Sequence, residues 1–402
     1  MKASHALFAA LALAAAPVFA HDDDPSTTFS TLITTPMAIE GLTNDANGNL
    51  YTPGRALNAG DPCPVWKISL SNPALVIVGL VPAPSATTSC SPSGLAIGPD
   101  GMVYVTETNR IFRFTPNADS PPTATVFASG VPGTNGLGFD WNGNLWTGDG
   151  TTGVGRVWKI TPAGAVTEMF RIPPMSNEVN LVAGVGGVGR DVRALPPGTI
   201  TVTATSRNAA NTAGSQPLVA NGVIFDNRKV YGKGRRSMFI ADTARGAIWQ
   251  VLMEDDSTPV IHTGCDTTFT ANTLCLDHIW VAHPAIEGAD GIALDVSGGI
   301  WVDANERNAV VYVWPWGQVR EVFRNLPNAT TQLRNGGPLE TPTSPVVAGE
   351  KFCTANSDGN RRDNSPSSAG EIGGTGQPKG KISCMDQRVT VNGAPVPVHQ
   401  DH

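Results

Sequence analysis

Short apolar runs separated by turn residues dominate the hydrophobic pattern of the chain. In residues 135–150 (NGLGFDWNGNLWTGDG), an apolar run leads into an Asn/Gly turn, and a second apolar run reaches Trp146 before the chain becomes polar again. Two apolar runs around such a turn predict a β-hairpin. Asn135 stands directly in front of this hairpin and is followed by a glycine.

The same pattern returns along the chain. Copies start at residue 40 (EGLTNDANGNLYTPG), residue 93 (SGLAIGPDGMVYVTE) and residue 290 (DGIALDVSGGIWVDA), and in each the aromatic follows eleven positions after the first residue. Looser copies start at residue 221, with a longer turn, and at residue 344, with a shorter one. Strand signals such as VWKISL and VWKITP follow several copies, so each unit is a meander of about four short strands. Six units predict an all-β protein, a six-bladed β-propeller with four-stranded antiparallel blades.

The two ends of the chain have different expected roles. Residues 1–20 have a charged start, a short apolar run and small residues near the end, which is typical of a signal peptide. Residues 25–395 are expected to form a single domain. The β-rich segments 27–35 (TTFSTLITT) and 388–398 (RVTVNGAPVPV) are candidates for the strands that close the ring. Because residues 1–20 resemble a signal peptide, we expect an exported protein, periplasmic or secreted.

Two inserts interrupt the repeat, near residues 169–216 and 357–380; the first is rich in Gly, Ala and Asn, and the second is rich in Gly and Ser. Their composition predicts long surface loops. The run GTITVTATSRNA at residues 198–209 leaves a degenerate seventh blade open as an alternative to a loop.

Composition and charge narrow the possible partners. The net charge is −7 and the isoelectric point is near 5.5, which argues against nucleic acid as a partner. No apolar run after the signal approaches the roughly 20 residues of a membrane span. We expect a monomer that binds a small molecule.

Six cysteines in an exported chain favour disulfides over metal thiolates, and no CxxC pair is present. Pairing between sequence neighbours is the simplest of the possible connectivities, and the short loop between Cys265 and Cys275 makes that pair the first choice. The disulfide candidates are Cys63, Cys90, Cys265, Cys275, Cys353 and Cys384.

The first residue of each unit precedes the strand that lines the central channel of a propeller, so these residues should converge at one mouth of the channel. All carry a side-chain oxygen, and none is a cation, thiol or imidazole. An oxygen-only set suits a hard cation, first of all Ca²⁺. The alternative is that each residue caps a turn, with a glycine behind it to allow a positive φ. The six residues are Glu40, Ser93, Asn135, Asn221, Asp290 and Ser344.

The segments IEGLTNDANGNLYTPG, TNGLGFDWNGNLWTGDG, NGVIFD with MFIADTARGAIWQV, and GADGIALDVSGGIWVDANERNAVVYVW resemble the SMP-30/gluconolactonase/LRE-like propellers. The resemblance implies one divalent cation, usually Ca²⁺ and otherwise Mg²⁺, Mn²⁺ or Zn²⁺, held by Glu40, Asn221 and Asp290. It also implies hydrolysis of a lactone or related ester, with Asn135 at the substrate and Asp290 as the base for water. An arginine that sugar-lactone members place two residues before the asparagine is missing, since Gly133 stands there.

Other functions remain open at this point. His283, seven residues before Asp290, is a candidate for the channel mouth and would be the base of a streptogramin-lyase-like enzyme. A non-catalytic, calcium-stabilised propeller that binds a ligand or partner protein is a further alternative. Ser93 and Ser344 lack a Ser-His-Asp pattern, which argues against a serine nucleophile. Asp149, Asp242 and Asp303 recur at the end of the second strand and are expected to be structural.

Overall fold

The computed structural model describes residues 28–173 and 220–385, with gaps at 153, 231–232, 268, 328, 331–333, 335, 349–350 and 358–378, together with two short strands near the C-terminus. The predicted signal peptide, residues 174–216 of the first predicted insert and most of the second lie outside the described residues. The alternative of a seventh blade at residues 198–209 also lies outside them.

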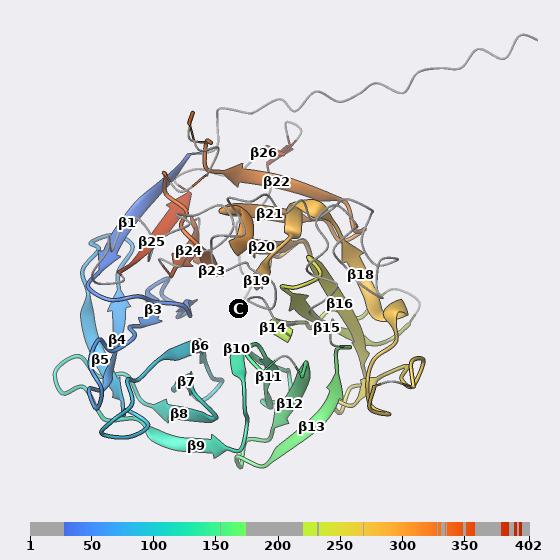
Figure 1. The fold of residues 1–402 in the computed structure, drawn as a ribbon, viewed down its shortest axis with the longest axis horizontal. Helices are drawn as coiled ribbons and strands as arrows, with labels where there is room; N and C mark the ends of the chain where they lie inside the picture. Colours follow the sequence, from blue (N-terminus) through green and yellow to red (C-terminus); the bar gives the residue numbers. More distant parts are fainter. Residues whose placement is uncertain are drawn as a thin grey trace, which may run out of the picture.

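Six antiparallel sheets radiate around a central axis, which confirms the six-bladed all-β propeller (Figure 1). The first five sheets run from an innermost strand to an outer strand in chain order. The first blade consists of β2 (Thr43–Asn44), β3 (Leu50–Pro53), β4 (Cys63–Ile68) and β5 (Val76–Val81). The second blade consists of β6 (Pro92–Ile97), β7 (Val103–Glu107), β8 (Arg110–Phe114) and β9 (Thr125–Ser129). The third blade consists of β10 (Thr134–Phe139), β11 (Leu145–Asp149), β12 (Arg156–Ile160) and β13 (Val166–Arg171).

The fourth blade has an interrupted outer strand. Its strands are β14 (Ala220–Asp226), β15 (Arg236–Asp242), β16 (Ala247–Met253), β17 (Pro259–Val260) and β18 (Ile279–Ala282), and both β17 and β18 pair with β16. The loop between β17 and β18 therefore splits one outer strand into two pieces. The fifth blade is regular, with β19 (Ala289–Leu294), β20 (Ile300–Ala304), β21 (Ala309–Val313) and β22 (Val319–Arg324).

The ring closes in the sixth blade with strands from both parts of the chain. The strand β1 (Phe29–Thr35) pairs with β25 (Gly380–Met385), which is followed inward by β24 (Lys351–Asn356) and β23 (Pro342–Ala348). The prediction that residues 27–35 contribute to closure is confirmed. The predicted closing segment at the C-terminus differs, because β26 (Thr390–Val391) and β27 (Ala394–Pro395) pair only with each other in the described chain.

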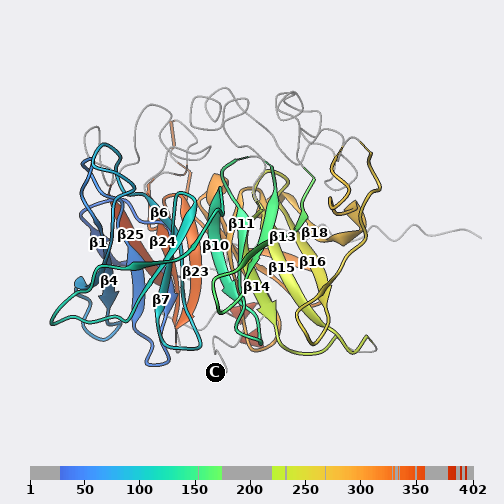
Figure 2. The same ribbon diagram turned by 90° about the horizontal axis from the view of Figure 1, so that it is seen from below.

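The innermost strands β6, β10, β14, β19 and β23 lie nearest the axis, and the strands run roughly along it (Figures 1 and 2). Neighbouring innermost strands approach each other so closely that a side chain does not fit between them. A Cβ at Gly136 would lie 2.7 Å from the carbonyl oxygen of Asn221, and a Cβ at Gly222 would lie 2.8 Å from that of Asp290. Gly41, Gly94 and Gly291 face the next blade in the same way.

This finding corrects the reason expected for the glycine that follows each channel residue. None of these five glycines has a positive φ. These glycines let the backbones of neighbouring blades approach each other closely at the axis, where the ring leaves no room for a Cβ.

The turn and the aromatic of the repeat are linked by an aspartate. Asp140 accepts hydrogen bonds from the backbone N–H groups of Asn142 and Asn144 and from the indole N–H of Trp146 at 2.8 Å. Asp45 similarly accepts from the Tyr51 hydroxyl at 3.0 Å. Trp146 is fully buried between blades. The aspartate thus ties the hairpin turn to the aromatic that packs in the core.

Three disulfides join sequence neighbours, as predicted: Cys63–Cys90, Cys265–Cys275 and Cys353–Cys384. Cys353 and Cys384 are direct partners on β24 and β25. Three bridges fit an oxidising environment. No helix of the described chain is long and apolar enough to span a membrane.

Replacing Gly222 by alanine should destabilise the propeller, because the new Cβ would meet backbone rather than a movable side chain. We expect a loss of about 1–3 kcal/mol in the free energy of unfolding, typical of overpacking. Thermal and denaturant unfolding measure it. Gly336→Ala is the matched control, since a Cβ there has no neighbour within 4 Å. Equal stability of the two variants would contradict the close-approach interpretation.

The Cys265–Cys275 disulfide should be the first to open in a mild reductant. Cys265 is exposed, whereas the cysteines of the other two bridges are at most 1% exposed. Timed alkylation followed by peptide mass spectrometry should therefore label Cys265 and Cys275 before the others. Simultaneous labelling of all six cysteines would show that opening requires global unfolding.

Candidate functional site

A cavity of about 350 Å³ lies at the axis, at the end of the blades where innermost strands begin and second strands end. Its lining comes from blades one to five and has two rings of residues. The first ring is the predicted set at the start of the innermost strands, namely Glu40, Ser93, Asn135, Asn221 and Asp290. The second ring lies just beyond the second strands, one residue after the strand end in blades two to five and two residues after it in blade one, and comprises Arg55, Thr108, Gly150, Thr243 and Asn305.

A backbone irregularity presents the first ring to the cavity. The pairing of β10 with β11 shifts register between Thr134 and Leu137, and equivalent shifts occur in the neighbouring blades. Such β-bulges free a residue from the regular ladder and re-aim its side chain. Asn135 and its equivalents stand in this shift.

The sixth blade departs from the expected register. The shift there lies between Pro342 and Ser344, so Thr343 takes the position equivalent to Asn135 and Ser344 takes that of the glycine. The approach of Gly291 to the carbonyl of Thr343 fits this alignment. Neither residue is in the cavity lining, and the Thr343 hydroxyl donates to the carbonyl oxygen of Glu40 at 2.7 Å.

Arg55 is a cavity residue that the repeat analysis missed. Its guanidinium forms an ion pair with Glu40, whose side chain is 13% exposed against 34% for that of Arg55. One of the two expected carboxylates therefore already has a cationic partner. The repeat has a second recurring position, close after the end of each second strand. This position includes both Arg55 and Asn305.

Asp290 is 5% exposed and is oriented by the second ring, since the Asn305 amide donates to its Oδ2 at 2.7 Å. The amide oxygen Oδ1 of Asn305 is buried and has no hydrogen-bond partner among the described residues. On the next blade, the Asn221 amide contacts the Thr243 hydroxyl at 3.4 Å. These contacts fix side-chain oxygens around the cavity.

Gly150 makes room for Asn135. A Cβ at position 150 would lie 2.6 Å from the amide nitrogen of Asn135. The second ring therefore leaves space for the first at this blade, and the Asn135 side chain occupies that space.

The three aspartates expected to be structural differ in their surroundings. Asp149 pairs with Arg156 at 2.9 Å, and Asp242 pairs with Arg245 at 2.8 Å, both buried at the end of a second strand. Asp303 stands one position earlier, because Ala304 is the residue paired with Ala289. It accepts a hydrogen bond from Thr354 of the next blade.

Asp303 is fully buried, and the desolvation of its carboxyl group raises its pKa well above the usual value; the nearby charge of Asp290 acts in the same direction. It is absent from the cavity lining. Its position behind Asp290 affects the field at the cavity without contact with a ligand.

His283 lies outside the cavity lining. Its Nδ1 accepts from the backbone N–H of Ala285 at 3.0 Å, where it caps a short 3₁₀ turn, η3 (Pro284–Ile286). Burial lowers its pKa, and the charge of Arg307 adds to this effect. This geometry is that of a structural cap.

The residues of the cavity fit a hard divalent cation. Two carboxylates and several amide oxygens face one small space, and the buried Asn305 oxygen is a further donor that a cation would satisfy. The ion pair of Glu40 with Arg55 means that a cation at Glu40 would share that carboxylate with a guanidinium. Within the part of the chain that the structure describes, the cavity lining holds no thiol or imidazole.

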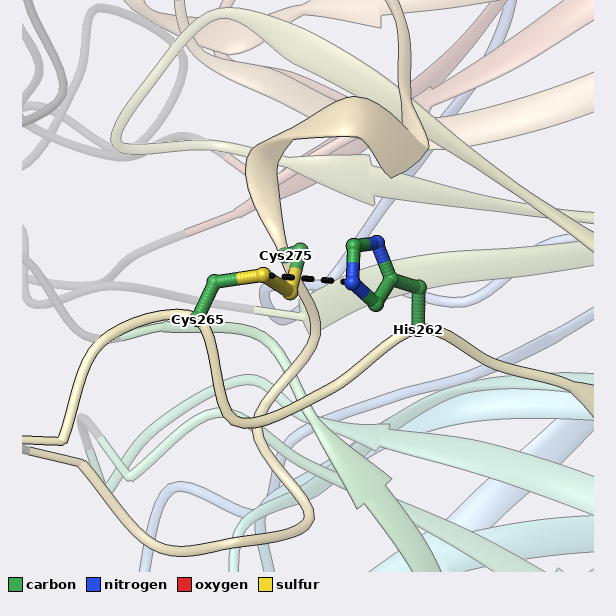
Figure 3. Close-up of side chains that lie close together, drawn as sticks. All are labelled: His262, Cys265 and Cys275. Atoms are coloured by element: carbon green, nitrogen blue, oxygen red, sulfur yellow. Dashed lines mark hydrogen bonds between the residues drawn. A yellow bond between two sulfur atoms is a disulfide. The ribbon is translucent and has the colours of Figure 1, made fainter.

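A second group with ligand-type atoms lies in the loop that splits the outer strand of blade four. His262, Cys265 and Cys275 gather there, with His262 Nε2 at 3.5 Å from the sulfur of Cys265 (Figure 3). The two sulfurs are joined in a disulfide, so neither is available as a thiolate. Asp277 holds Nδ1 of His262 at 2.7 Å. These residues therefore form a surface loop that is cross-linked by a disulfide.

No family model and no curated protein matches this chain. Solved structures share its fold at low identity. A luciferin-regenerating enzyme has a TM-score of 0.53 at 12% identity, covering 89% of this chain and 95% of the other. The calcium-binding protein regucalcin from Agrobacterium tumefaciens has 0.51 at 14%, covering 92% and 97%. The PQQ-bound aldose sugar dehydrogenase from Streptomyces coelicolor has 0.51 at 15%, covering 90% and 99%. These likenesses show that the chain has the propeller fold found in an LRE protein and a regucalcin.

Proposed function

We propose that the protein is an exported, metal-dependent hydrolase that opens a lactone or a related ester. One observation carries the proposal: Glu40, Asn221 and Asp290, from three distant parts of the chain, line one small cavity together with Asn135. Carboxylates and amides converging on a space of this size suit a hard cation and a small ligand.

In this proposal Glu40, Asn221 and Asp290 hold a divalent cation, most simply Ca²⁺. When bound, the cation would polarise the carbonyl of the ester and stabilise the charge that develops on its oxygen. Asp290 accepts a proton from the attacking water, and the Asn305 amide holds its carboxylate in place through Oδ2. Asn135 orients the substrate through its amide, in the space left by Gly150.

The fold alone does not select this chemistry, because the similar structures include a calcium-binding protein, a luciferin-regenerating enzyme and a PQQ-bound dehydrogenase. The donor set of the cavity supports the hydrolase. The capping role of His283 weighs against a lyase that uses this histidine as its base. The remaining alternative is a calcium-stabilised propeller that binds a ligand without turnover.

Calcium should bind at the cavity and stabilise the fold. We expect Glu40→Gln and Asp290→Asn each to weaken Ca²⁺ binding by at least about 10-fold, because each removes a charged ligand. Calorimetric titration of the chelator-treated protein measures the affinity, and thermal unfolding measures the stabilisation. Asp61→Asn, a change in an exposed loop, is the control. If chelation alters neither calcium content nor melting temperature, the cation proposal fails.

Hydrolysis should depend on Asp290. In a panel of γ- and δ-lactones and aryl esters with Ca²⁺, Mg²⁺, Mn²⁺ or Zn²⁺, Asp290→Asn should lower kcat by about 10²- to 10⁴-fold, the usual contribution of a general base. Asp61→Asn should retain wild-type rates. Calcium binding without hydrolysis of any panel member would favour the non-catalytic propeller.

A further inference from the structure

The lining of the cavity has two chemically different sides. Blades three to five supply the amides, Asp290 and three threonine hydroxyls, and the amides with Asp290 suit a cation. Blades one and two supply three hydroxyls and a guanidinium, and the guanidinium suits an anion. The second side consists of Arg55, Ser91, Ser93 and Thr108, with Glu40 ion-paired to Arg55.

A buried carboxyl group fixes the second side from behind. Glu107 is 1% exposed and accepts hydrogen bonds from the Thr108 hydroxyl at 2.9 Å and from the backbone N–H of Ser91 at 3.3 Å. Burial raises its pKa, while Arg110 and Arg55 act in the opposite direction. Thr108 has φ of 58°, a strained conformation for a β-branched residue. The backbone at Thr108, which lines the cavity together with Arg55, is therefore held in one defined conformation.

Charge within the lining also points to an anion. Glu40 and Asp290 carry two negative charges, and Arg55 carries one positive charge, the only cationic side chain of the lining among the described residues. A divalent cation held by these carboxylates makes the sum one positive charge. A neutral substrate would leave this excess in a small cavity, whereas a substrate with one anionic group would neutralise it.

We propose that Arg55 binds an anionic group of the substrate, a carboxylate or a phosphate, so that the site selects lactones or esters that carry a negative charge beside the bond to be cleaved. This inference rests on the proposed hydrolase and adds its substrate class. A cation at Glu40 would compete with the guanidinium for that carboxylate, and the fork of N–H donors of Arg55 matches two oxygens of such a group. The exposed third of Arg55 at the cavity makes this contact accessible.

Binding of reaction products tests the inference without turnover. The calcium-loaded protein is titrated with 2-hydroxyglutarate, the product of a carboxylate-bearing γ-lactone, and with 4-hydroxybutyrate, which lacks the extra carboxylate. We expect tighter binding of 2-hydroxyglutarate, and Arg55→Met should weaken it by about 10- to 100-fold with little change for 4-hydroxybutyrate. Arg55→Lys should restore part of the loss, since it keeps the charge but not the fork.

Arg113→Met is the matched control, because Arg113 and the Phe127 ring below it both belong to blade two and Arg113 lies outside the cavity lining. Calcium affinity provides a separate readout, and Arg55→Met should keep or increase it because a competing cation is removed. The inference is overturned if wild type does not prefer 2-hydroxyglutarate, or if Arg55→Met weakens both ligands equally.

Kinetics separate this inference from the hydrolase itself. The carboxylate-bearing γ-lactone, its carboxamide and a phosphate-bearing lactone are compared as substrates. Arg55→Met should raise KM for the anionic substrates and leave the carboxamide unchanged, and the better of the two anionic substrates identifies the group. If wild type opens no lactone, the hydrolase proposal fails, and the binding titration still decides the role of Arg55.

Discussion

The close packing of backbone at the central axis is the constraint on which the rest of the structure depends. Neighbouring innermost strands meet at a glycine, and a Cβ at Gly136 or Gly222 would lie within 2.8 Å of the next blade's carbonyl oxygen. In blades one to five the residue before this glycine lines the cavity. The channel residue and the glycine behind it therefore serve the chemistry of the site and the packing of the ring, respectively. The glycine is required for steric reasons and not for a positive φ.

Much of this was readable from the sequence because it is local and repeated. The eleven-residue spacing reports the hairpin and its buried aromatic, and the Asp140 contacts give that spacing a cause. The neighbour pairing of the cysteines and the closing strand at residues 27–35 follow from chain order. Convergence of Glu40 and Asp290 on one cavity follows from ring geometry alone.

The rest needed coordinates, for physical reasons. In blade six a serine stands where other blades have glycine, so no local marker separates Thr343 from Ser344, and only strand pairing fixes the register. Asp303 looks equivalent to Asp149 in sequence, but a shift of one residue turns it to the other face of the sheet. Arg55 belongs to the second ring, but the members of this ring share no residue type that would mark them in the sequence, and the contact of Arg55 with Glu40 depends on the fold.

The described residues of blade six do not line the cavity, yet this blade connects ring closure to the site. The Thr343 hydroxyl holds the carbonyl of Glu40, and Thr354 holds Asp303 behind Asp290. Both threonines belong to the sheet that β1 completes. The blade that joins the two ends of the chain thus contacts the backbone of Glu40 and the carboxyl group of Asp303. A ring that fails to close would lose the backbone support of Glu40 and the partner of Asp303 together, so formation of the site is coupled to completion of the fold.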